Sequence, residues 1–120
     1  MIKLFDTIFE KFENEVMEII ISEDPSISEL LGEQYKVAKV VNREFTGVGF
    51  FTTFYINDNS LRLPTTKNLT LGNVQARFKG LERGAGFVLF VNNGFINTLE
   101  GYTYEEDWPI SIEGYTFYNV

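Results

Sequence analysis

The chain has 120 residues, of which 44% are hydrophobic and 22% are charged, and it carries a net charge of −7 with no cysteine and no histidine. This length and balance predict a single domain over residues 1–120 that can bury a core without disulfides or structural metal. Lack of Cys and His excludes thiol nucleophiles, Ser/His catalysis and zinc, haem or iron–sulfur sites that need these ligands, so we predict no metal and no cofactor and lean towards a non-enzymatic protein.

Charge is unevenly distributed along the chain. Both ends are acidic, whereas residues 35–98 hold eight bases and three acids. These bases are dispersed and the acidic surroundings repel phosphates, so we expect no nucleic-acid partner. The start of the chain lacks a basic region followed by an apolar run, and charges interrupt every apolar stretch, which predicts no membrane span and a cytoplasmic location.

The first predicted element is an amphipathic helix over residues 2–21. Apolar residues recur at helical spacing from Phe5 to Ile20. The opposite face carries Asp6, Glu10, Lys11, Glu13, Asn14 and Glu18. We expect this charged face to be solvated or turned towards a basic partner.

The next segment predicts a short helix over residues 25–31. Asp24 supplies an N-cap before Pro25, and Gly32 stands where a left-handed C-cap would fall. Residues 35–45 fit both a helix and a strand, and their β-branched content favours a strand.

Strand signals dominate the remainder. Residues 50–56 are apolar on both faces, which is typical of a central strand, and they are followed by a turn at 57–60 and an irregular connection over 61–68. Apolar and polar residues alternate over 74–79, which predicts a half-buried strand. The aromatic segment 114–120 predicts a short last strand.

The strongest local signal is the Asn93-Gly94 pair between two apolar runs, 87–92 and 95–102. Asn-Gly suits both positive-φ positions of a type I′ turn, so we predict a β-hairpin. A regular two-residue loop pairs Phe87 with Glu100, which places Glu100 on an apolar face.

In that register Glu100 is the acid that lies among apolar side chains. The predicted neighbours on its face are Phe87, Leu89, Val91 and Ile96. Burial raises the pKa of a carboxyl group unless a cation offsets it. We favour a structural ion pair of Glu100 with Arg43, Arg77 or Lys79.

Together these elements predict an α+β fold in which two N-terminal helices pack on one face of a mainly antiparallel sheet of about five strands. Strands 50–56 and 87–92 are apolar on both faces, but two helices cover only one. A homodimer that uses the aromatic sheet face is the arrangement we favour.

Acids and aromatics gather in residues 100–109. Paired carboxylates among aromatic rings are typical of glycoside hydrolysis, although such clusters are more often solvated loops. The candidate catalytic residues are Glu100, Glu105, Glu106 and Asp107. The candidate partner-binding residues are Tyr102, Tyr104, Glu105, Glu106, Asp107 and Trp108.

The segments Arg43–Thr52, Gly84–Phe90 and Leu99–Thr103, together with Trp108-Pro109, resemble a family of small uncharacterised bacterial proteins. The likeness covers about residues 34–109. It implies a bacterial α+β protein of one domain and assigns no activity and no site.

Our leading hypothesis is a cytoplasmic, non-enzymatic protein-binding domain, similar to the small acidic immunity proteins that neutralise toxins. A basic partner would meet the acidic face of the first helix or the segment 102–108. The alternatives are a small-molecule or carboxylate-hydrolase pocket around Glu100, and a homodimeric structural protein.

Overall fold

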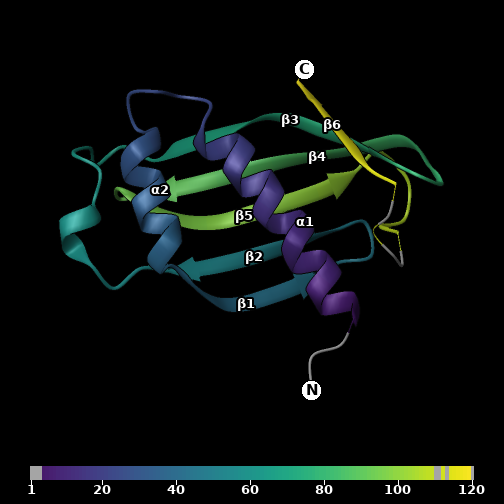
Figure 1. Cartoon of the computed structure of the whole chain (residues 1–120), viewed down its shortest axis with the longest axis horizontal. Coiled ribbons are helices and arrows are strands. Elements are labelled where there is room, and N and C mark those ends of the chain that lie inside the picture. Colours follow the sequence, from purple (N-terminus) through teal and green to yellow (C-terminus); the bar gives the residue numbers. More distant parts are fainter. Residues whose placement is uncertain (1–3, 110–111, 113, 120) are drawn as a thin grey trace.

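The computed structural model of the chain describes residues 4–109, 112 and 114–119. Its elements are α1 (Leu4–Ile21), α2 (Ser28–Val37), β1 (Lys39–Phe45), β2 (Gly49–Tyr55), the 3-10 helix η1 (Asn59–Leu61), β3 (Leu69–Phe78), β4 (Leu81–Asn92), β5 (Phe95–Thr103) and β6 (Thr116–Asn119). The six strands form one sheet in the order β1-β2-β5-β4-β3-β6, and all neighbours are antiparallel. Both helices lie on the same face of this sheet (Figure 1). The α+β prediction is therefore confirmed, with six strands instead of five.

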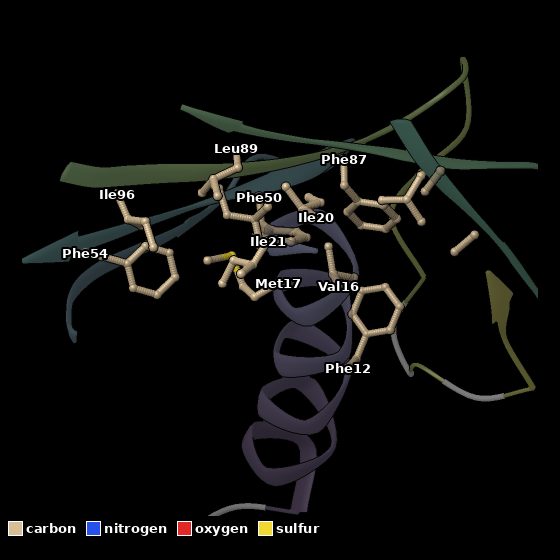
Figure 2. Close-up of a cluster of buried hydrophobic side chains, with 14 of the residues drawn as sticks. Phe12, Val16, Met17, Ile20, Ile21, Phe50, Phe54, Phe87, Leu89 and Ile96 are labelled. Atoms are coloured by element: carbon tan, nitrogen blue, oxygen red, sulfur yellow. The ribbon is translucent and has the colours of Figure 1, made fainter. Parts of the chain in front are cut away.

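Helix α1 forms because its apolar residues make a continuous stripe at helical spacing. Members of this stripe that are almost completely buried are Phe9, Phe12, Val16, Met17 and Ile20. They pack beneath inward-facing residues of the sheet, among them Phe50 of β2 and Phe87 of β4 (Figure 2). The helix predicted over 2–21 is thus confirmed within the described residues.

Helix α2 begins and ends later than predicted, at Ser28 and Val37. The Asp24 carboxylate accepts hydrogen bonds from the backbone N–H and the hydroxyl of Ser26, so it closes a turn ahead of the helix. Gly32 lies inside the helix without a positive φ. The helix continues past it because Gln34 is buried against the β4–β5 hairpin, a tertiary contact that outweighs the local stop signal.

Strand β1 covers only the second part of the segment 35–45, since residues 35–37 belong to α2. Strand β2 lies between β1 and β5 and presents Phe50, Thr52 and Phe54 to the helices. The alternation predicted over 74–79 is also confirmed, because Val74, Ala76 and Phe78 are buried and face the helices. Strand β6 fulfils the prediction of a short final strand.

The β4–β5 hairpin turns at Asn93 and Gly94, which have φ angles of 52° and 83° as a type I′ turn requires. Its register differs from the prediction beyond the first two pairs. Phe90 lies opposite Thr98 whereas Val91 lies opposite Ile96, so Asn97 is an extra residue on β5. This bulge reverses the orientation of every residue that follows it.

The bulge moves Glu100 to the opposite face of the sheet. It pairs with Val88 instead of Phe87, while Leu99 takes the inward position opposite Leu89. Glu100 is half-buried, and no ion pair joins it to Arg43, Arg77 or Lys79 among the described residues. The prediction of Glu100 on the apolar inner face is wrong.

Candidate functional site

A cleft of about 590 Å³ opens between α1, the end of α2 and strand β1. We call it the α1–β1 cleft. Its polar lining residues come from both helices and from β1, and Ala38, Val40 and Phe54 add apolar walls. The cleft therefore offers charge and apolar surface side by side.

At the base of the cleft lies an ion pair between Glu13 of α1, which is buried, and Arg43 of β1, which is partly buried. Arg43 Nη2 is 2.6 Å from Glu13 Oε1, and Arg43 Nε donates to Oε2 at 3.2 Å. The Thr52 hydroxyl donates to Glu13 Oε2 at 2.5 Å. Glu13 is only 3% exposed, so the expectation that it is solvated is wrong. Three donors compensate the cost of burying its charge.

The rim of the cleft carries exposed carboxylates. Glu18 accepts a long hydrogen bond of 3.4 Å from the Asn14 amide, and within the described part of the chain no cation lies in salt-bridge range of it. Glu10 lies 4.0 Å from Arg43 Nη1, but that guanidinium is already engaged by Glu13. Lys36 also lines the cleft, but its Nζ lies 3.1 Å from Glu33 Oε1, so the rim is acidic overall.

Tyr35 forms another part of the lining and packs edge-on against Phe54 at 6.0 Å between ring centroids. Burial, reinforced by the negative charges of Glu13 and Glu18, raises the pKa of Tyr35 to about 12. Its hydroxyl therefore stays protonated to a higher pH than that of an ordinary tyrosine.

The acidic and aromatic segment predicted to bind a partner is divided between different environments. Trp108 packs on Phe50 and Phe78 at centroid distances of 5.2 and 5.7 Å, so its ring belongs to the core. Arg83 engages two of the acids, because its Nη1 lies 2.9 Å from Glu105 Oε2 and its backbone N–H donates to Glu106 Oε1 at 2.8 Å.

Tyr102 and Tyr104, at the end of β5, meet edge-on with 5.6 Å between their ring centroids. The Tyr104 hydroxyl accepts a hydrogen bond from the Gln75 amide, whose oxygen accepts one from Tyr118. A Cβ at Gly86 would lie 2.6 Å from the Tyr102 ring, so a larger residue there would displace that ring. Burial and the hydrogen bond with Tyr102 raise the pKa of Tyr104 to about 12.

None of the predicted acids Glu100, Glu105, Glu106 and Asp107 lines the α1–β1 cleft. Within the described residues, no group of three or more acids is arranged to hold a metal ion. No described helix is long and apolar enough to cross a membrane. Catalysis by these carboxylates and a pocket at Glu100 stay predictions.

The residues that sequence reasoning missed are Glu13 and Gln34. Glu13 occupies the inward stripe of α1, four residues after Phe9 and three before Val16. A charged residue at a core position of such a stripe indicates a buried partner, and this was the signal available. Gln34 carried no comparable signal.

Comparisons with protein-family models, with curated proteins and with solved structures find no match for this chain. The fold and the site define a two-layer α+β domain with an acidic cleft at one edge of its helical layer.

Proposed function

We propose that this chain is a non-enzymatic protein-binding domain that takes a basic segment of its partner into the α1–β1 cleft. The observation that carries the proposal is the acidic rim formed by Glu10 and Glu18. The two cations of the lining are each engaged by a carboxylate, Arg43 by Glu13 and Lys36 by Glu33, and therefore offer little attraction to an anion.

The charge of the helical layer supports a basic partner. Residues 4–37 contain nine acids and two lysines. A surface with an excess of one sign attracts oppositely charged molecules and accelerates their association. This is also the charge relation between a small acidic immunity protein and a basic toxin, which is the class of partner we propose.

The walls of the cleft suit a lysine or arginine side chain. Ala38, Val40 and Phe54 provide apolar surface for the aliphatic stem. The rim carboxylates and the neutral Tyr35 hydroxyl are acceptors for the charged head. Because the buried Glu13–Arg43 pair holds α1 to β1, the shape of the cleft is set before binding.

The proposal is tested by titrating isotopically labelled protein with hexa-arginine and hexaglutamate peptides. We expect amide shifts from hexa-arginine alone, concentrated on α1, the end of α2 and β1. The variant Glu10→Gln/Glu18→Gln should weaken binding about thirtyfold, since each rim charge contributes about 1 kcal/mol in a solvated site and the two together contribute about 2 kcal/mol.

The matched control is Glu29→Gln/Asp107→Asn, which removes the same charge from exposed positions outside the cleft. It should leave the affinity within about twofold because both lost charges are distant and screened. Equal weakening by the two variants would show that the peptide responds to net charge, and the cleft would lose its role.

A further inference from the structure

Exposed apolar side chains are concentrated at one edge of the molecule. Among the residues whose side chains are described, the large apolar ones with 42–58% exposure are Val37, Val40, Val41, Phe45, Val48 and Tyr55. Five of them lie on β1 or within four residues of its ends, and Tyr55 lies opposite its first residue. We call this surface the β1 edge. Apolar clustering of this kind marks an interaction site.

Strand β1 pairs with β2 on one side and with no described strand on the other. The free side presents backbone N–H and C=O groups along seven residues. Such an edge is a template for another strand. We call the face of the sheet opposite the two helices the open face (Figure 1). The edge of the sheet is therefore a better surface for self-association than this aromatic open face.

We infer that a second copy of this chain docks on the β1 edge, with the two β1 strands antiparallel across a two-fold axis. The inference goes beyond the proposed function, since it concerns a different partner, and the β1 edge adjoins the α1–β1 cleft and shares Val40 with it. A C2 interface of this type uses the same patch on both copies, so the patch must be complementary to itself.

The charges along β1 meet this requirement. Lys39 at its start and Glu44 near its end both lie on the open face of the sheet, because they pair with Tyr55 and Phe51 of β2. Antiparallel pairing of two copies lays the start of one strand beside the end of the other. Lys39 of each copy then faces Glu44 of the second copy, at both ends of the interface.

A bulge at Val41 selects this register. Val40 and Asn42 pair with consecutive residues of β2, so Val41 is an extra residue. Because of it, Lys39 and Glu44 share one face although they are five positions apart. Pairing Lys39 with Glu44 also sets Val40 opposite Arg43, and both of these point to the helix side.

Neighbouring elements extend the complementarity. Phe9 contacts Phe45 at 5.2 Å between ring centroids, which places the acidic N-terminal half of α1 beside the end of β1. Helix α2 ends beside the start of β1 with Lys36 and Val37 (Figure 1). The two-fold axis therefore brings Glu10 and Phe45 of one copy towards Lys36 and Val37 of the other.

Cysteine cross-linking tests the register directly, because the chain has no native cysteine. Under mild oxidation, a mixture of Lys39→Cys and Glu44→Cys proteins should form disulfide-linked dimers. Either variant alone should not, since identical positions lie roughly 15 Å apart and a disulfide needs Cα atoms within about 7 Å. Glu29→Cys mixed with Glu44→Cys controls for random collision. Cross-linking no greater than in that control would overturn the inference.

Sedimentation of the wild-type chain measures the association itself. We expect a dimer that Lys39→Glu weakens at least tenfold and that Lys39→Glu/Glu44→Lys restores, while Lys67→Glu, in the loop before β3, has no effect. A wild-type monomer at several hundred micromolar would overturn the inference and identify the bulge as a device that protects the edge. Peptide binding in the cleft is measured separately, so either proposal can fail alone.

Discussion

Two glutamates that lie next to opposite faces of the sheet have different environments, because the helices cover only one of these faces. Glu13 contacts Thr52 on the covered face, and Glu100 lies opposite the adjacent residue, Phe51, on the open face. Glu13 is 3% exposed and held by Arg43, whereas Glu100 is half-buried with no ion pair among the described residues. One step along β2 thus separates a carboxylate that requires partners from one that water can solvate.

The largest difference in stability between the two faces should come from substitutions of aromatic residues. Phe12 is fully buried and its ring lies near those of Phe78, Phe87 and Trp108, whereas Phe51 is half-buried on the open face. Phe12→Ala should cost about 3–5 kcal/mol of unfolding free energy, and Phe51→Ala about 1–2 kcal/mol. Urea denaturation measures both. Equal losses would mean that something covers the open face in solution.

The two glutamates provide the next contrast. Glu13→Gln leaves the Arg43 guanidinium partly buried without its main counter-charge, so it should cost about 3 kcal/mol. Glu100→Gln should change stability by less than about 0.5 kcal/mol. The double variant Glu13→Gln/Arg43→Met should regain much of the stability that Glu13→Gln loses, because it leaves no buried charge without a partner. If Glu100→Gln proves the more damaging, the observed hairpin register is incorrect.

Gln34 tests the hydrogen bonds of the covered face. Its amide donates to the Leu61 and Gly94 carbonyls at 2.7 and 2.8 Å and accepts from Ile96 N–H at 2.8 Å. Gln34→Ala should cost about 2–3 kcal/mol because these groups lose their partner away from water. Gln75→Ala, which frees only half-buried tyrosine hydroxyls, should cost about 1 kcal/mol. Hydrogen exchange at Ile96 reports whether the loss is local.

The smallest predicted effect on stability comes from Tyr35 and appears only at high pH. Burial raises the pKa of Tyr35 to about 12 from its ordinary value of 10.0. Between these values the unfolded chain loses the proton before the folded chain does, so stability is full below pH 10 and falls as pH rises. Tyr35→Phe should make the melting temperature fall less steeply from pH 10 to 12. An unchanged slope would place the Tyr35 hydroxyl in water.

Local patterns were sufficient for elements whose determinants lie within a few residues. The stripe from Phe9 to Ile20 specifies α1 because every turn buries the same side. Asn93 and Gly94 specify the hairpin turn because few residue pairs accept positive φ at both positions. Alternation in β3 assigned Val74, Ala76 and Phe78 to the covered face for the same local reason.

Tertiary structure decided the features that depend on distant residues. Helix α2 runs through Gly32 because Gln34 bonds to the β4–β5 hairpin, 60 residues away. The side of the sheet on which Glu100 lies depends on one extra residue, Asn97, which no short-range pattern marks. Glu13 could be buried only because β1 and β2 bring Arg43 and Thr52 beneath it, 30 and 39 positions along the chain. Sequence alone therefore determined α1, the hairpin turn and the buried side of β3, whereas the extent of α2, the orientation of β5 beyond its bulge and the environment of each charged group depended on distant residues.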